Sequence, residues 1–370
     1  MEPPAGKISI TYSLADQSFA RTKSIGILNV SVGLLQALAQ RTECGPLTVL
    51  SNHSMDERLA PINKVKIEHH DHAAGRGPGR IWWDQFAAYS AAQRISSEWL
   101  FLPKGFASFS RRCPVRLATF VHDAMPDYYD RHYPGTIPGF EAAYFRAAFH
   151  ASIQQSDVIF TPTEFSLSEI TRVTREKSWR PPRMVCCGEG FDRPAAKPAM
   201  ERRDIVMLAN RFPHKLTQQA VNFLDRWWRE NSFAEEIHWI GSYPKKMELP
   251  AHPNWRRHAT LPEAEFRALM SRARVVLFFS GYEGFGRPPV EAALAGACPV
   301  YSSLPVTREV MGDCGYSFDN ASYESFATAL RQALKISPDQ LQLWADKLLA
   351  RHDWSEVAER VVSALAVKAP

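Results

Sequence analysis

The sequence predicts an α/β protein of two domains, each built on a parallel sheet. Three observations carry this prediction. The chain has 370 residues, more than the roughly 250 to 300 at which a single core stops growing. Apolar runs of strand length alternate with helical segments in its first half. Residues 274–301 follow the order strand, glycine loop, helix, strand, which places the glycine loop at the carboxyl end of a parallel sheet.

The first domain is expected over residues 1–193. Its apolar strands are predicted at residues 8–12, 47–50, 100–103, 117–123 and 158–161, with a helix over residues 27–40 between the first two. After the last of these strands, Thr163 is expected to cap a helix, with Ser166 three residues on.

The second domain is expected over residues 204–350, after a polar, proline-bearing linker at residues 194–203. It opens with an apolar strand near residue 204, and a helix is predicted to begin near residue 260. The last segment, residues 351–370, carries apolar residues at helical spacing.

The segment 280–292 places two carboxylates, Glu283 and Glu291, eight positions apart. Gly284, Gly286 and the proline pair that starts at Pro288 prevent a continuous helix across it. Since proline is favoured in a first helical turn, the helix should begin near Pro288. Glu283 then lies on a glycine loop and Glu291 just inside the helix.

This arrangement suits a sugar joined to a diphosphate. The helix N-terminus offers N–H donors and about half a positive charge to an anion, and Gly286 permits close approach of a ligand. Glu291 would repel a phosphate, so neutral hydroxyls are its expected partners. Alternatively, Glu283 only offsets the helix dipole and Glu291 is solvated; the strand, loop, helix, strand context favours the binding interpretation.

Two cations, Arg211 and Lys215, leave the strand that opens the second domain. Fixed cations at that place would stabilise a departing diphosphate as its negative charge grows. In the first domain, His122 and Asp123 end an apolar strand and are suited to bind hydroxyls. The alternative is a packed histidine and a capping aspartate before a turn, and paired surface cations are common on their own.

Net charge, cysteine content and hydrophobicity narrow the classes of function that the protein can have. A net charge of +5, split almost evenly between the halves, argues against nucleic-acid binding. The patch of Arg111, Arg112 and Arg116 allows weak attraction to an anionic bilayer, or is a solvated loop. Six cysteines without C-x-x-C spacing indicate reduced thiols in a cytoplasm, and no segment approaches the roughly 20 apolar residues of a membrane span.

A histidine-rich stretch at residues 68–72 looks like a metal cluster. Adjacent ligands on an extended stretch point to opposite sides, and the sequence indicates no distant Cys or Asp partner. We therefore expect no metal there.

Residues 280–313 resemble the donor site of retaining glycosyltransferases of family 4, which have the GT-B fold and the pattern E-x7-E. Glu283 and Glu291 fit that pattern, and residues 302–313 are similar to the family's serine, proline, Glu-Val, Gly-Asp run. Arg287 stands where many members carry Leu. The resemblance implies two facing Rossmann-like domains and a terminal helix, residues 351–370, that crosses back to the first domain.

The resemblance also implies roles for the site residues. Glu283 would hold donor-sugar hydroxyls, Glu291 the ribose, and His122 the sugar from the opposite domain. The diphosphate would be held by Arg211, Lys215 and the amides of Gly284, Phe285 and Gly286. Gly26, ahead of the first helix, and Leu261, in a loop of the kind that surrounds the nucleotide base, complete the candidate donor-binding residues.

The function implied is retaining, metal-independent transfer without a cofactor from a nucleotide-diphosphate sugar to a glycan or lipid-linked oligosaccharide. The leaving phosphate would accept the acceptor's proton, and domain closure would assemble the site. GDP-mannose is the favoured donor, because residues 82–85 with His122 and Asp123 resemble bacterial mannosyl and rhamnosyl transferases of surface polysaccharide assembly. A UDP-sugar donor, a sugar-nucleotide epimerase and a non-catalytic nucleotide-sugar binding protein are the alternatives. The expected location is cytoplasmic, with peripheral contact at the inner membrane.

Overall fold

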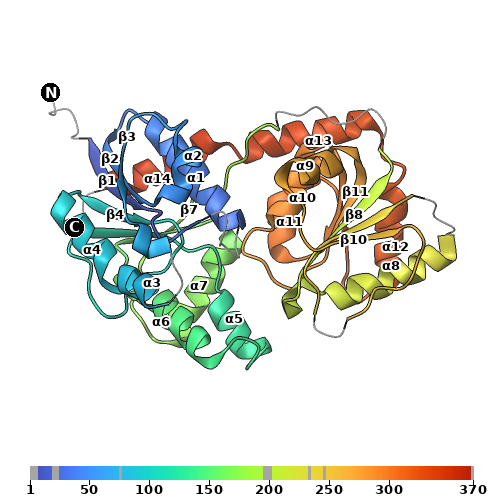
Figure 1. The fold of residues 1–370 in the computed structure, drawn as a ribbon, viewed down its shortest axis with the longest axis horizontal. Helices are drawn as coiled ribbons and strands as arrows, with labels where there is room; N and C mark the ends of the chain where they lie inside the picture. Colours follow the sequence, from blue (N-terminus) through green and yellow to red (C-terminus); the bar gives the residue numbers. More distant parts are fainter. Residues whose placement is uncertain are drawn as a thin grey trace. The chain divides into compact units, whose positions relative to one another are not determined.

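A computed structural model describes residues 7–18, 25–74, 77–194, 202–231, 235–244 and 247–367. The chain divides into two compact units (Figure 1). Unit 1 comprises Met1–Phe191 together with His352–Pro370, and unit 2 comprises Asp192–Arg351. Residues 195–201, which make up most of the expected linker, lie outside the described residues.

Unit 1 contains a seven-stranded sheet in its described residues, with the strand order β3-β2-β1-β4-β5-β6-β7. All neighbouring strands run parallel. Such strands are covered on both faces, which is why β4 is a continuous apolar run, buried throughout. The strands are β1 (Ile8–Ser13), β2 (Cys44–Ser51), β3 (Val65–His69), β4 (Trp99–Leu102), β5 (Arg116–Phe120), β6 (Val158–Thr161) and β7 (Arg183–Cys186).

The helices of unit 1 cover its sheet, and the chain enters them from loops at the carboxyl ends of the strands. Thr163 caps α7 as predicted, its side chain accepting the Ser166 N–H at 3.1 Å. The α-helices are α1 (Ile25–Gln40), α2 (Asp56–Leu59), α3 (Pro78–Trp82), α4 (Ala88–Ile95), α5 (Met125–His132), α6 (Gly139–Gln155), α7 (Glu164–Glu176) and α14 (Trp354–Ala366), with short turns η1 (His53–Met55), η2 (Asp71–Ala74) and η3 (Trp83–Ala87).

The final helix, α14, belongs to the core of unit 1. Its buried residues, among them Val357 and Val361, share one apolar cluster with α1 and β1, and α14 lies against α1 (Figure 1). The Trp354 indole requires two glycines beside it: a Cβ at Gly33 would lie 2.2 Å from the indole, and one at Gly190 2.1 Å from it. A side chain at either position would push α14 away.

Unit 2 contains a six-stranded parallel sheet in its described residues, with the order β10-β9-β8-β11-β12-β13. Its strands are β8 (Asp204–Ala209), β9 (Ile237–Gly241), β10 (Trp255–His258), β11 (Ala273–Phe278), β12 (Cys298–Ser302) and β13 (Tyr316–Phe318). Its helical elements are η4 (Pro213–Lys215), α8 (Thr217–Asn231), α9 (Glu263–Arg272), α10 (Arg287–Leu294), α11 (Pro305–Met311), α12 (Tyr323–Ala333) and α13 (Pro338–Arg351).

The strand order of unit 2 fixes where a ligand can bind. From β8 the chain continues to β9 on one side, whereas β11 lies on the other side of β8. The loops that leave β8 and β11 therefore turn in opposite directions, and the carboxyl ends of two such strands are where the ligand crevice of an open α/β sheet is expected. The predicted α/β class with two parallel sheets is confirmed, and Lys215 and Glu283 lie on the two loops that border this position.

Candidate active site

An ion pair joins the two loops at this crevice. Lys215 ends η4, the turn that follows β8, and its ammonium contacts the Glu283 carboxylate on the loop after β11. The two side chains are 23% and 12% exposed, so the pair is largely shielded from solvent. The ammonium also lies 5.3 Å from the centre of the Phe278 ring. The structure thus brings together a cation and a carboxylate that are 68 residues apart.

The loop that carries Glu283 is held by hydrogen bonds from three strand ends. The Ser280 N–H donates to the Ser302 hydroxyl at 2.9 Å, and that hydroxyl donates to Asn320 Oδ1 at 2.7 Å. The Asn320 amide donates in turn to the Ser280 carbonyl at 2.9 Å. Ser280 and Ser302 are fully buried. This closed network fixes the base of the loop before any ligand arrives.

His214 couples the two loops through its backbone. Its carbonyl accepts the Gly281 N–H at 2.6 Å and the Ser280 hydroxyl at 3.3 Å. Its imidazole is 5% exposed, and burial, reinforced by the Lys215 charge, lowers its pKa from 6.5 to about 4. The histidine is therefore neutral at pH 7, and the Lys215–Glu283 pair has an uncharged neighbour.

The helix after the glycine loop begins where the sequence predicts. Gly286 is the N-cap of α10, with φ 86° and ψ 57°, and Pro288 lies in the first turn. A left-handed N-cap of this kind requires glycine, since a Cβ is strained at that φ. The chain therefore turns sharply from Glu283 into the N-terminus of α10, so Gly284 and Phe285 lie between the carboxylate and the positive end of a helix dipole.

Glu291 lies one turn into α10 and is 43% exposed. Arg287 donates from Nε to its Oε1 at 3.1 Å. Arg287, which stands where many family members carry Leu, therefore pairs with Glu291 and shields part of its charge. With 43% of its side chain exposed, Glu291 remains accessible to a ligand.

Arg211 and Leu261 occupy the rim of unit 2. The side chain of Arg211 is exposed and lies over the Phe212 ring at 5.5 Å, while its N–H donates to the Ser242 hydroxyl at 3.2 Å. Leu261 lies between β10 and α9, partly buried against the core. Both belong to loops at the carboxyl ends of strands, the edge of the sheet that carries Glu283.

His122 and Gly26 belong to unit 1. His122 follows β5 and is 8% exposed; its Nε2 donates to the Pro103 carbonyl at 2.9 Å, and its Nδ1 lies 3.6 Å from Glu189. Asp123 accepts the Met125 N–H at 2.8 Å and so fixes the start of α5. Both nitrogens of His122 thus face protein groups in this structure. Gly26 was expected ahead of the first helix, but α1 begins at Ile25, so Gly26 lies inside its first turn.

A polar pocket in unit 1 escaped the sequence analysis. Asp16, Asp84 and Lys104 line it together with Trp83. The Lys104 ammonium lies 2.6 Å from Asp16, and burial together with the Asp16 charge raises the pKa of Asp84. These residues come from three segments of the chain, and of the four only Trp83 and Asp84 belonged to a run that the sequence singled out. Pro103, the hydrogen-bond partner of His122, also lines the pocket.

The expected basic patch is largely engaged within unit 1. Arg111 bonds the Ser90 hydroxyl at 2.8 Å, and the Arg116 guanidinium lies 3.9 Å from the centre of the Trp99 ring. None of the helices in the described part of the chain combines the length and apolar content that a membrane crossing requires.

Comparison with known proteins identifies a family for part of unit 2. Residues 245–347 match the family described as glycosyl transferases group 1. This segment is a glycosyl transferases group 1 domain. It runs from the loop after β9 through most of α13 and includes Glu283, the glycine loop and Glu291, whereas Lys215 and Arg211 precede it.

One curated relative and two solved structures extend the comparison. The O-antigen chain mannosyltransferase B of Escherichia coli is 23% identical over 247 residues, 60% of this chain and 61% of the relative, so the match spans about three fifths of that protein. HepE of Anabaena, in complex with UDP and glucose, superimposes with a TM-score of 0.68 at 13% identity, over 98% of this chain and 100% of HepE. Sucrose-phosphate synthase of Thermosynechococcus elongatus superimposes with a TM-score of 0.67 at 12% identity, over 97% of this chain and 98% of the synthase.

The structural likeness shows that the fold is GT-B, as the resemblance implied. This likeness concerns the fold alone. The group 1 domain and the mannosyltransferase relative support transferase activity.

Proposed function

We propose that this chain is a retaining glycosyltransferase of family 4 that transfers a sugar from a nucleotide-diphosphate donor to a hydroxyl of a glycan or lipid-linked glycan in surface polysaccharide synthesis. One observation carries the proposal: the shielded Lys215–Glu283 pair at the crevice between β8 and β11, beside the N-terminus of α10. A sugar diphosphate needs a cation and an acceptor of hydroxyl hydrogens side by side. This pair supplies both.

Donor binding would exchange the partners of this pair. The Lys215 ammonium would move from the Glu283 carboxylate to a diphosphate oxygen, and the carboxylate would then accept hydrogens from sugar hydroxyls. The N-terminus of α10 would face the same diphosphate. Arg211, exposed on the rim, would join Lys215 there, and Glu291 would bind the ribose hydroxyls.

The same groups would act during transfer. As the glycosidic bond stretches, negative charge accumulates on the leaving diphosphate, and Lys215 and Arg211 stabilise that charge without a metal ion. A leaving phosphate oxygen takes the proton of the attacking hydroxyl, so the mechanism needs no carboxylate nucleophile. The nucleotide diphosphate leaves as the new glycosidic bond forms on the same face of the sugar.

GDP-mannose is the proposed donor, supported by the mannosyltransferase relative. A UDP-sugar is the second candidate, favoured by the likeness to HepE in complex with UDP and glucose. Incubating the full chain with a panel of GDP- and UDP-sugars, and measuring release of the nucleotide diphosphate with and without a glycan acceptor, separates the two. Turnover confined to UDP-sugars would refute the mannose assignment.

Glu283→Ala tests the site itself. We expect transfer to fall at least 100-fold, while the nucleotide still binds in calorimetry because Glu283 touches the sugar. The matched control is Glu265→Ala, an exposed glutamate in the first turn of α9, which should leave transfer unchanged. Full transfer by Glu283→Ala would contradict the proposal. If the unsubstituted chain converts the donor without an acceptor, it is an epimerase. If it binds the donor and transfers nothing, it is a binding protein.

The polar pocket of unit 1 is the proposed acceptor subsite. Its carboxylates suit acceptor hydroxyls, and Lys104 compensates their charge. Asp84→Asn should raise the KM for the acceptor several-fold and leave donor hydrolysis unchanged. Asp130→Asn, which changes a surface partner of Arg146, is the matched control. An unchanged acceptor KM for Asp84→Asn would remove the pocket from the proposal.

A further inference from the structure

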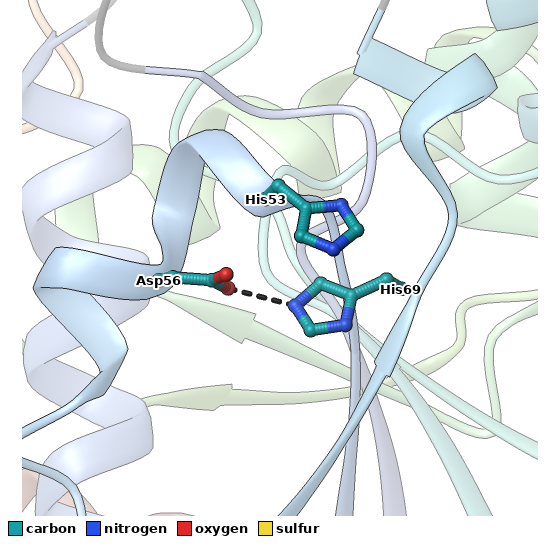
Figure 2. A group of neighbouring side chains, drawn as sticks. All are labelled: His53, Asp56 and His69. Carbon is teal, nitrogen blue, oxygen red and sulfur yellow. Dashed lines mark hydrogen bonds and ion pairs between the residues drawn. The ribbon is translucent and has the colours of Figure 1, made fainter.

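A group of histidine and aspartate side chains lies at the edge of unit 1, outside both proposed subsites. His53 begins the turn η1 after β2, Asp56 begins α2, and His69 is the last residue of β3 (Figure 2). Since β2 and β3 pair in parallel with Ser51 opposite His69, the residues that follow β2 come to lie beside His69. The sequence indicates no distant partner for a metal at residues 68–72, but the fold brings two, His53 and Asp56, beside His69.

The three side chains converge on one point. The His69 Nε2 and the Asp56 Oδ1 are 2.7 Å apart, and the His53 and His69 rings are nearly parallel with centres 4.1 Å apart. One ligand atom from each of the three residues lies within 4.8 Å of the other two. Ligands about 2.1 Å from a tetrahedral zinc are about 3.4 Å from each other, so small side-chain rotations suffice to reach that geometry.

A fourth residue orients His53. Asp71 accepts both the backbone N–H of His53 at 2.9 Å and its Nδ1–H at 2.6 Å. The Nε2 is therefore the nitrogen left for a ligand, and in Figure 2 this edge of the ring points toward His69. A carboxylate behind a ligating histidine is the usual outer partner of a metal site, because it fixes the tautomer and raises the basicity of the ring.

The donor set selects the kind of ion. Two imidazoles and one carboxylate match Zn²⁺ and its first-row neighbours, whereas Mg²⁺ and Ca²⁺ prefer oxygen ligands alone. Asp56 and Asp71 bring two negative charges to two imidazoles, which suits a divalent cation. Coordination through Nε2 would replace the hydrogen bond between His69 and Asp56, and the His69 ring would then carry its proton on Nδ1.

A second group, Asp204, Glu236 and His238 in unit 2, also brings three ligand atoms together. There Arg272 bonds Asp204 at 2.8 Å and Arg256 bonds Glu236 at 2.8 Å. Each carboxylate already has an arginine partner, so a divalent ion would have to displace or oppose two positive charges. This group carries no proposal and serves as an internal comparison.

We propose that His53, His69 and Asp56 bind one divalent transition-metal ion of the zinc class, with Asp71 as the outer partner of His53 and water at the fourth position. The ion ties the turn after β2 to the end of β3. It belongs to unit 1, whereas the donor crevice belongs to unit 2, and it takes no part in the proposed sugar transfer.

Co²⁺ titration of the full chain, first stripped with chelator, tests the proposal. One equivalent should give the visible absorption of tetrahedral cobalt, and one equivalent of Zn²⁺ should abolish it. His53→Ala and His69→Ala should remove the signal, and Asp71→Ala should weaken binding by about 10- to 100-fold. His72→Ala, an exposed histidine of the same stretch, is the matched control and should titrate normally.

Other outcomes overturn the proposal. Absence of a saturable one-to-one signal at tens of micromolar Co²⁺ would exclude the site. A signal that survives in His53→Ala and His69→Ala but disappears in His238→Ala would assign the ion to unit 2. If His53→Ala fails to fold, the same Co²⁺ titration of Asp71→Ala and Asp56→Asn tests whether these residues hold the ion. Sugar transfer is assayed separately in chelator, so loss of the metal site leaves the proposed function standing.

Discussion

Acid should weaken unit 2 through His214, and the structure gives the size of the effect. Burial lowers the pKa of this imidazole to about 4, from 6.5 in an exposed chain. The unfolded chain therefore binds a proton at a pH where the folded one does not, and stability rises with pH across this window. The free energy of unfolding therefore decreases as the pH falls from about 6.5 to 4. The full decrease is about 3 kcal/mol, because one pKa unit corresponds to about 1.4 kcal/mol.

Urea unfolding of the unsubstituted chain and of His214→Gln at pH 7 and pH 5 measures this effect. About 2 kcal/mol of the loss should already be present at pH 5, since the folded imidazole is still neutral there while the unfolded one is charged. His214→Gln lacks that titration and should lose correspondingly less. Because the His214 carbonyl holds Gly281 and Ser280, donor binding should weaken over the same window. Parallel losses in both proteins would refute the reasoning.

Three further predictions concern single side chains. Lys215→Met should lower kcat about 100-fold or more with a smaller effect on donor KM, because the ammonium acts on charge that develops during transfer; steady-state kinetics showing only a raised KM would contradict this. Gly286→Ala should destabilise unit 2 by about 1 to 2 kcal/mol in urea unfolding, since the φ of 86° strains a Cβ that has room beside it, and Gly286→Asn should cost less. Gly33→Ala should destabilise unit 1 by about 1 to 3 kcal/mol through the clash with Trp354, and Trp354→Ala should reduce that difference in a double-mutant cycle; additive losses would argue against the clash.

Glycine and proline residues near Glu283 made much of the donor crevice predictable from the sequence. Gly286 and Pro288 set the start of α10 within their own few residues, so Glu283 could be placed on a loop and Glu291 inside a helix. The strand, loop, helix, strand order then indicated the carboxyl edge of the sheet. The sequence placed Lys215 and Glu283 on two separate loops and did not predict their contact, which depends on the strand order β9-β8-β11.

Features that depend on packing between distant segments could not be predicted from the sequence. The group at His53 and His69 exists because β2 and β3 pair with Ser51 opposite His69, and no local pattern gives that register. The pocket lined by Asp16 and Lys104 joins segments 88 residues apart. His122 was placed correctly at a strand end, but its hydrogen bond to the Pro103 carbonyl depends on a neighbouring strand.

The return of α14 to unit 1 has a consequence for biosynthesis. Unit 2 is continuous in sequence, whereas unit 1 needs residues from both ends of the chain. A ribosome therefore releases every residue of unit 2 before it releases Trp354, whose indole fills the space left by Gly33 and Gly190. The domain whose synthesis starts first is the one that closes last, and a nascent chain halted at residue 351 would present a finished second domain beside a first domain with its apolar groove still open.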